Sequence, residues 1–367
     1  MEKRAEPDNE KKRIGIVGAG KISGIYLKNL RGMFGKRVIL TGITDLITAQ
    51  AAQAAEEYHI RPMKDLQELI ACAEVDIVLN LTQPQNHYAV ALAAVRGGKH
   101  VYNEKPLCVS REEALTLLSS AQEQQVRVGC APDTFLGAGI QTCRKLIDEG
   151  WIGRPLSAVA FMMNHGHEHW HPNPAFYYKT GAGPLFDMGP YYLTALVNLL
   201  GPIARVSGSA QQGFKTRTIT SEPLNGQLIT VEVPTHIAGV LDFACGAVGT
   251  IITSFDVYAH SLPYLEIYGT EGSLKVPDPN TFGGPVLIRR GSAEEWSEIP
   301  LLKDFPENSR GLGVTDMAEA IVEGRPHRAS GELAYHVLEV MHGLQDASAS
   351  GTYYHVQRLC SQPEPMA

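Results

Sequence analysis

A lysine at the end of a strand-like run is the first candidate for chemistry in this sequence. Lys105 follows the β-branched and aromatic run of residues 100–103 and the carboxylate of Glu104, and it precedes Pro106. An amine at such a place can hydrogen-bond a substrate hydroxyl and take part in proton transfer. The alternative is a solvated surface lysine, so the choice depends on the elements that position Lys105.

A glycine turn near the start of the chain indicates a dinucleotide site. Residues 14–17 are a short apolar run typical of a buried strand, and residues 25–30 have helical apolar spacing. Between them, Gly18 permits a tight turn and Gly20 allows backbone to approach a pyrophosphate on the helix N-terminus. Ser23 replaces the third glycine of the motif. The expected cofactor contacts here are Gly18, Gly20, Lys21, Ile22 and Ser23.

An acidic residue ends the second expected strand, at residues 38–44. Asp45 is placed to bind the ribose 2′-hydroxyl, and Leu46 and Ile47 follow it where an arginine would favour a 2′-phosphate. This favours NAD over NADP. The alternative role for Asp45 is the N-cap of a helix over residues 48–58.

Strands and helices continue to alternate up to residue 130, which predicts a parallel sheet with helices on both faces. Strands are expected at 75–81, 100–103 and 126–130, and helices at 65–71, 88–96 and 110–124. Ligands of such sheets bind outside the carboxyl ends of the strands. The loops there add these expected cofactor contacts: Leu81, Thr82, Gln83, Asn86, His87, Glu104 and Lys105.

The pattern changes after residue 155 to strand-like runs separated by glycine turns, which is typical of a mostly antiparallel sheet. The runs span residues 157–163, 204–212, 227–233, 236–243, 248–255, 264–268, 273–276 and 286–290. Helices are expected at 193–200, 314–323 and 333–348. We predict an α/β chain with a disordered tail at 1–12, a Rossmann domain at 13–135 and an α+β domain at 136–367. The late helices are candidates to pack back on the Rossmann domain.

Two polar groups in the second half are candidates for the substrate side. Asp187 and Tyr191 are four residues apart and share a face if a helix begins by Asp187, although Asp187 could instead cap that helix. Histidines recur at every second position from 165 to 171, which would place them on one face of a strand. A polyol site with Trp170 as an apolar platform, a zinc site, and plain surface histidines are the alternatives. The expected substrate contacts are Lys105, Asp133, His165, His167, Trp170, Asp187 and Tyr191, with no metal.

Composition narrows the class of partner. The net charge of −7 and the absence of a basic run argue against nucleic acid and anionic membranes. The cysteines are scattered without a C-x-x-C pair, as expected for reduced thiols in a cytoplasm. The charged N-terminus lacks the apolar core of a signal peptide.

Three motifs together resemble one family, in order and spacing over nearly the whole chain. Residues 15–20 with Ile22 and Ser23, residues 103–106, and residues 181–192 are similar to the glucose-fructose oxidoreductase / inositol dehydrogenase / MocA-like (Gfo/Idh/MocA) family. The resemblance implies a Rossmann domain, an open sheet that faces the nicotinamide and mediates homodimers or homotetramers, bound NAD(H) or NADP(H), and sugar-like substrates. It implies catalytic roles for Lys105 and Asp187. Many members carry histidine where this chain has Tyr191.

We therefore expect an NAD-dependent enzyme that oxidises a secondary hydroxyl of a sugar, polyol or sugar derivative. Lys105 would bind that hydroxyl, and Asp187 and Tyr191 would set its protonation and relay the proton. The resemblance also implies an alternative, a glycosidase that keeps NAD bound and oxidises, eliminates and re-reduces its substrate. A non-catalytic NAD-binding sensor is a third interpretation, against which the intact Lys105 and Asp187 argue.

Overall fold

The computed structural model describes residues 11–366 and divides into two units. Of the described residues, the first unit comprises residues 11–133 with Ser309–Tyr335, and the second comprises Thr134–Asn308 with residues 336–366. Most of the predicted N-terminal tail, residues 1–10, lies outside the described residues. The first strand begins at Lys12, inside the predicted tail.

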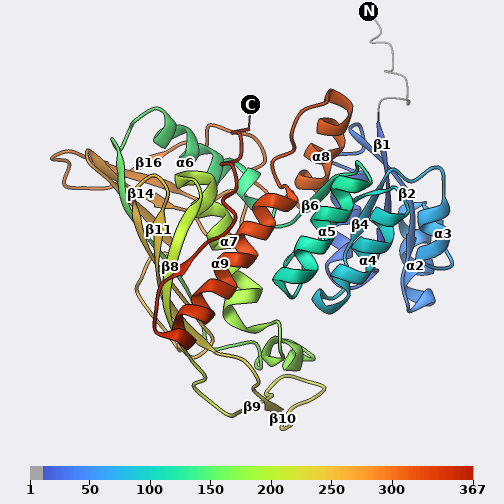
Figure 1. Ribbon diagram of the computed structural model, residues 1–367, viewed down its shortest axis with the longest axis horizontal. Coiled ribbons are helices and arrows are strands. Elements are labelled where there is room, and N and C mark those ends of the chain that lie inside the picture. Colours follow the sequence, from blue (N-terminus) through green and yellow to red (C-terminus); the bar gives the residue numbers. More distant parts are fainter. Residues whose placement is uncertain (1–10, 367) are drawn as a thin grey trace, which may run out of the picture. The chain divides into compact units, whose positions relative to one another are not determined.

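Unit 1 is built on a six-stranded parallel sheet in the order β3-β2-β1-β4-β5-β6, the Rossmann order. Its central strand β4 is buried at every position, as its apolar sequence predicts. Helices α4 and α5 lie side by side next to the sheet (Figure 1). The elements are β1 (Lys12–Val17), α1 (Ser23–Arg31), β2 (Val38–Thr44), α2 (Thr48–Tyr58), β3 (Arg61–Pro62), α3 (Leu66–Ala71), β4 (Ile77–Asn80), α4 (Pro84–Arg96), β5 (His100–Asn103), α5 (Arg111–Glu123), β6 (Val128–Cys130) and α8 (Leu312–Glu323).

Local signals place the start of three of the helices listed for unit 1. Asp65 caps α3 by accepting a hydrogen bond from Glu68 N, and Ser110 and Glu113 form the predicted capping box of α5. Helix α4 begins at Pro84, four residues earlier than predicted, because a proline at the first helical positions needs no N–H partner. Asn86 and His87 therefore belong to the helix and not to the preceding loop.

Unit 2 is built on a nine-stranded sheet in the order β16-β15-β14-β13-β7-β12-β11-β8-β17. The β7–β12 pair is parallel and the other pairs are antiparallel, as predicted for a mostly antiparallel sheet. Helix α7 packs on its central strands. The main strands are β7 (Pro155–Met163), β8 (Ile203–Gln211), β11 (His236–Phe243), β12 (Val248–Ser254), β13 (Leu265–Gly269), β14 (Gly272–Val276) and β15 (Val286–Arg290).

Several elements of unit 2 were not predicted. Strand β9 (Thr216–Thr218) was not predicted, whereas β10 (Leu228–Thr230) lies within the strand predicted at 227–233. The two strands form a separate ribbon at the bottom of Figure 1. The remaining elements are the short helices η2 (Thr134–Leu136) and η3 (Pro174–Tyr178), helices α6 (Ala138–Asp148), α7 (Gly183–Leu200) and α9 (Gly331–Ser350), and strands β16 (Ser297–Ile299) and β17 (Tyr354–His355). Gly208 and Gly239 allow α9 to approach the sheet, because a Cβ on either would lie within 2.6 Å of Leu344.

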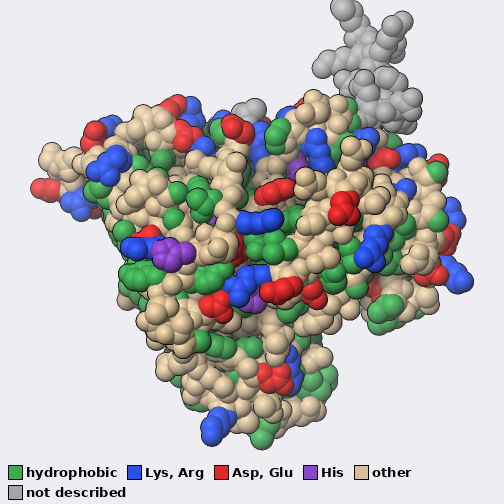
Figure 2. Space-filling model, viewed as in Figure 1, with side chains coloured by type: hydrophobic (Ala, Val, Ile, Leu, Met, Phe, Trp, Pro, Cys, Tyr) green, Lys and Arg blue, Asp and Glu red, His purple; other side chains and the backbone are tan. Residues whose placement is uncertain are grey.

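The surface charges and the cysteines of the structure can be compared with the composition of the sequence. On the face shown in Figure 2, cationic and anionic side chains are interspersed, without a large patch of one sign. All six cysteines lie within the described residues and are free thiols. Among residues 11–366, no helix has both the length and the apolar character that crossing a bilayer requires.

Candidate functional site

The glycine turn after β1 has the geometry that its sequence predicts. Gly18 has φ +104°, and a Cβ there would lie 2.8 Å from the carbonyl oxygen of Leu81, so a side chain is excluded. A Cβ on Gly20 would meet no atom within 4 Å, which leaves backbone open to a ligand. Ser23 begins α1 and its hydroxyl donates to the Gly20 carbonyl oxygen over 2.7 Å. The turn therefore offers an accessible backbone at a helix N-terminus, which suits a pyrophosphate.

Asp45 is not the N-cap of α2, because that position is Ile47 and no side chain caps it. The Asp45 carboxylate instead accepts two backbone N–H bonds of 2.7 Å, from Ala19 in the glycine turn and from Ile47. It therefore holds the end of β2 against the glycine turn, at the edge where a ribose would lie. Leu46 beside it is 97% exposed, an apolar surface available to an adenine ring.

A buried polar network joins the ends of β4 and β5. Asn80 and Asn103 are paired in register, and Asn80 Nδ2 donates to Asn103 Oδ1 over 3.0 Å. Asn80 Oδ1 accepts the Thr82 hydroxyl over 2.7 Å, and Asn103 donates to the Leu107 carbonyl over 2.9 Å. The network orders both loops that follow these strands.

His87, predicted as a cofactor contact, is fully buried beneath these loops. Its Nδ1 lies 2.6 Å from the Pro106 carbonyl oxygen and its Nε2 lies 2.9 Å from the Thr82 carbonyl oxygen. Burial lowers the pKa of His87, and the two carbonyls and Glu104 oppose that effect. The buried His87 ring therefore links the loop after β4, through Thr82, to the loop after β5, through Pro106.

Lys105 is the half-buried member of an otherwise buried stretch, residues 101–108. Glu104 beside it is buried: its Oε1 accepts the Tyr26 hydroxyl over 2.7 Å and its Oε2 accepts Lys105 N over 3.0 Å. Glu104 thus ties helix α1 to the lysine backbone. Lys105 is therefore the one side chain of residues 101–108 that is partly exposed to solvent, and buried neighbours hold its backbone.

Asp133, predicted as a substrate contact, is 1% exposed. Its Oδ2 accepts hydrogen bonds from Gly311 N and Gly313 N over 2.9 and 3.0 Å at the start of α8. Burial raises the pKa of Asp133 to about 6, against the lowering effect of these N–H groups. Asp133 therefore joins the segment after β6 to the start of α8 within unit 1.

In unit 2, Asp187 and Tyr191 lie one turn apart inside α7. The helix begins ten residues before the predicted 193–200 segment and its N-cap is Ala182, so Asp187 does not cap it. Asp187 is 16% exposed, and its Oδ2 lies 3.4 Å from His167 Nε2. Tyr191 is 8% exposed. The structure therefore brings three of the predicted substrate residues of this unit into one region.

The histidine run is a loop, and its members do not share a face. Gly166 has φ +83° and turns the chain between His165 and His167. His167 packs against Tyr177, with ring centroids 3.8 Å apart, and against Phe255. His165 instead stacks on Tyr258, with centroids 3.6 Å apart. Trp170 is 49% exposed. Among the described residues, no three His, Cys, Asp or Glu side chains are grouped to hold a metal.

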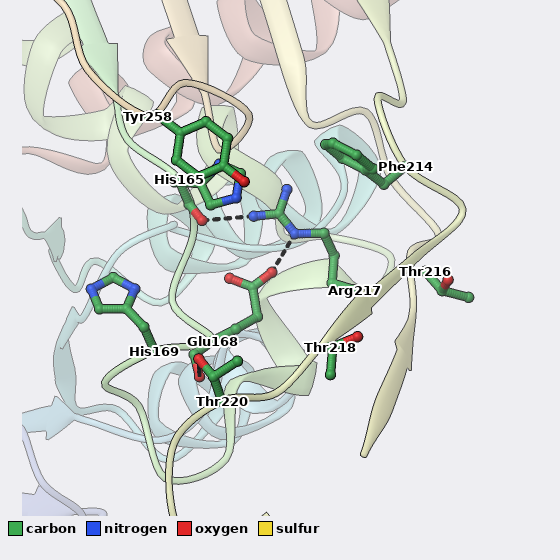
Figure 3. A pocket seen from close by; sticks show the side chains of 9 residues that line it. All are labelled: His165, Glu168, His169, Phe214, Thr216, Arg217, Thr218, Thr220 and Tyr258. Carbon is green, nitrogen blue, oxygen red and sulfur yellow. Dashed lines mark hydrogen bonds and ion pairs between the residues drawn. The ribbon is translucent and has the colours of Figure 1, made fainter. Parts of the chain in front are cut away.

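A hollow of about 390 Å³ opens on the His165 side of this loop (Figure 3). Its floor contains Arg217, whose Nε donates to Glu168 and whose Nη1 donates to Asp256 over 2.8 Å. Arg217 Nη2 also donates to the His165 carbonyl over 2.6 Å. Arg217 thereby fastens the β9 ribbon to the histidine loop. The sequence analysis drew attention to His165 and His169 here but missed the rest of the hollow.

The missed residues carried weak local signals. Glu168 lies inside the histidine run, whose spacing drew attention to the imidazoles alone. Arg217 is a buried cation between two exposed threonines in a three-residue strand, and its partners are far away in sequence. Asn80 and Asn103 could have been found, because polar residues end two adjacent strands of one parallel sheet.

Two family models match this chain, one within unit 1 and the other within unit 2. The family model described as "Oxidoreductase family, NAD-binding Rossmann fold" matches residues 12–131, and the model of the Gfo/Idh/MocA C-terminal domain matches residues 140–275. The chain is 26% identical over 317 residues to scyllo-inositol 2-dehydrogenase (NAD(+)) of Bacillus subtilis (strain 168), covering 85% of this chain and 87% of that protein. It is 24% identical over 308 residues to D-xylose dehydrogenase of Paenarthrobacter nicotinovorans, covering 76% and 77%.

A solved structure has the same fold. Levoglucosan dehydrogenase in complex with NADH and L-sorbose matches with a TM-score of 0.81 and 20% identity, covering 95% of this chain and 99% of that one. Taken together, the two family models match well over half of the sequence, in the order and at the places where the two units have their sheets. The chain therefore belongs to the Gfo/Idh/MocA oxidoreductase family and begins with that family's NAD-binding Rossmann domain.

Proposed function

We propose that this protein is an NAD-dependent dehydrogenase acting on a secondary hydroxyl of a sugar, polyol or sugar derivative. The observation that carries the proposal is the arrangement at one edge of the parallel sheet in unit 1. The Gly18 turn, Asp45, Thr82 and Lys105 all follow the carboxyl ends of its strands. This is where ligands of such sheets bind. The dehydrogenases among its relatives support the same class of substrate.

The residues present suit the cofactor. A turn closed to side chains at Gly18 and open at Gly20 fits a pyrophosphate, and the Asp45 carboxylate fits a ribose diol. We propose that Lys21, Ile22, Ser23 and the loop from Leu81 to Gln83 complete the cofactor contacts, with Asn86 at the start of α4. His87 and Glu104 act through the loops they hold, because both are buried.

When bound, NAD supplies the hydride acceptor for the substrate carbon. In this proposal the Lys105 Nζ holds the reacting hydroxyl, and the hydroxyl proton moves either to Nζ or to the Tyr191 hydroxyl. Asp187 would set the protonation of the reacting group, and within unit 2 its Oδ2 lies 3.4 Å from His167 Nε2. We propose His165, His167 and Trp170 as further substrate contacts. His165 stacks on Tyr258, whereas His167 packs against Tyr177.

The assay is the formation of NADH with a panel of neutral sugars and polyols. Stoichiometric NADH and oxidised product support the dehydrogenase. Release of an aglycone from a glycoside without net NADH, with deuterium uptake from solvent next to the oxidised carbon, would instead support the redox-cycling glycosidase. Tight NAD binding with neither reaction would favour a sensor.

Location and assembly remain predictions. We propose a cytoplasmic homodimer or homotetramer associated through the sheet of unit 2. Size-exclusion chromatography with light scattering gives the mass directly, and a monomer at micromolar concentration would contradict the assembly.

A further inference from the structure

Apart from His165, the side chains of the hollow beside the histidine loop have no role in the proposed reaction. The hollow lies on the side of the histidine loop occupied by His165 and Glu168, whereas His167 faces Asp187. Its volume of about 390 Å³ lies within the range of small-molecule sites, about 300 to 1,000 Å³. The hollow is therefore large enough for a small molecule and lies in the same unit as the proposed substrate residues.

The charges of the pocket exclude an anion. The Arg217 side chain is 6% exposed, and its cation is matched against two carboxylates, Glu168 and Asp256. Four of its five N–H groups are already donated, to Glu168, Asp256, the His165 carbonyl and the Phe255 carbonyl. The floor thus carries one excess negative charge and offers no free guanidinium fork. A carboxylate or phosphate would be repelled here.

The walls fit a ring with hydroxyl groups and an apolar face. Tyr258 is 85% exposed although one of its faces covers His165, so its other face is open. Phe214 supplies a second exposed aromatic surface. Thr216 and Thr218 are exposed on β9 and add hydroxyls that have no partner among the described residues.

The histidine adds directed hydrogen-bonding capacity. His165 Nδ1 is buried and has no hydrogen-bond partner within residues 11–366. Burial, followed by the charge of Arg217, lowers the pKa of His165, so its ring is neutral near pH 7. A neutral imidazole has one donor and one acceptor nitrogen, the pair that a sugar hydroxyl complements.

We infer that this pocket is a binding site for a neutral cyclic sugar, stacked on Tyr258 and hydrogen-bonded by His165 and the β9 threonines. The inference deepens the proposed function, because it adds a second ring position beside the substrate residues of unit 2. The ring comes either from a separate monosaccharide or from the second ring of a disaccharide or glycoside. The chemistry that recognises it is the same in both cases.

The test measures binding in the absence of turnover, with Lys105→Met protein and saturating NAD. Calorimetry and saturation-transfer NMR follow methyl β-D-glucopyranoside, maltose and cellobiose, with glucuronate as the matched anion. We expect at least one neutral probe to bind saturably, and glucuronate to bind more weakly than methyl β-D-glucopyranoside. Tyr258→Ala should weaken the neutral probe about 3- to 10-fold, the range expected for one aromatic contact.

Two matched variants identify the site. Tyr258→Phe keeps the ring and should keep the affinity, and Tyr353→Ala removes an aromatic ring of the same unit, 49% exposed and outside the pocket, without effect. Thr218→Val, which keeps the shape of the side chain, should weaken binding by deleting one hydroxyl. If Asp187→Asn also lowers the affinity for a disaccharide but not for the monosaccharide, one ligand extends from the pocket to Asp187. If it changes neither, the ring is a separate monosaccharide.

Other results would overturn the inference. These are neutral probes that do not bind, binding that is unaffected by Tyr258→Ala, or tighter binding of glucuronate. The proposed function is judged separately, by NADH formation in wild-type protein. A protein that forms no NADH but binds sugar through Tyr258 refutes the dehydrogenase and keeps this site.

Discussion

Replacing Asp45 by asparagine separates two roles that the structure gives to one carboxylate. Its oxygens accept bonds of 2.7 Å from Ala19 N and Ile47 N, and asparagine keeps the size with only one acceptor oxygen. Hydrogen bonds to a charged group are worth about 1.5–3 kcal/mol. Because the glycine turn would lose one such bond, we expect NAD affinity to fall by about 10-fold or more.

The same substitution should change cofactor preference. A carboxylate next to a 2′-phosphate is a like-charge contact that costs several kcal/mol, so the wild-type protein should prefer NAD by more than about 10-fold. Asp45→Asn removes the repulsion, so NADP affinity should fall much less than NAD affinity, and the preference should drop by about 10-fold. Calorimetric titration of both cofactors measures the two effects.

The control is Asp65→Asn, which removes one carboxylate from the same unit but keeps a residue that caps α3 well. It should leave both affinities unchanged. If Asp45→Asn weakens NAD and NADP by the same factor, Asp45 is a structural tie for the turn and does not read the ribose. Equal affinities in the wild-type protein would refute the assignment directly.

Three further predictions concern Asp133, metal and Tyr191. The pKa of Asp133 is about 6 in the folded protein, about two units above its ordinary value. The free energy of unfolding should therefore fall as the pH rises from about 4 to 6, because the unfolded state loses its proton first. Above pH 6 the full loss, about 3 kcal/mol, is present. Urea unfolding measures the free energy of unfolding of Asp133→Asn minus that of wild type, and this difference should increase by about the same amount between pH 4 and 7. A difference that does not change with pH would contradict the raised pKa of Asp133. Activity should survive chelation and metal analysis should find well below one equivalent, whereas stoichiometric zinc with loss of activity would support the metal alternative for the histidine loop. Tyr191→Phe should lower kcat as much as Lys105→Met if Tyr191 relays the proton and only slightly if Lys105 is the base, with Tyr192→Phe, a buried neighbour, as the unaffected control.

The Rossmann unit could be predicted closely because its signals are local. Apolar runs without alternation identify strands buried on both faces, and the glycine turn, Asp45 and Lys105 each follow such a run. The start of α4 was placed four residues too late, because residues up to His87 were assigned to the loop after the strand. Helix α7 was underpredicted because Gly189 and Pro190 interrupt it, although nearly all its residues are buried and packing compensates for their poor helix propensity.

The substrate side could be predicted only in part. Asp187, Tyr191 and His167 were named from spacing and from resemblance, and the structure groups Asp187 with His167. The pocket that contains His165 depends on contacts between residues 49 and 39 positions apart, those of Arg217 with Glu168 and Asp256. No periodicity in the sequence reports such pairs. Asp133 and His87 were also named as ligand contacts, and the structure buries both side chains within unit 1, which no pattern in the sequence reports.

The most direct test of the account is the turnover of Lys105→Met. Methionine keeps the length and apolar stem of the side chain and deletes the nitrogen that should hold the reacting hydroxyl. General acid–base help is worth about 10²- to 10⁴-fold, so kcat should fall by that much with any sugar or polyol that wild type oxidises. NAD affinity should stay close to wild type, because the Gly18 turn and Asp45 are untouched. Near-normal turnover by Lys105→Met would contradict the central role of this lysine.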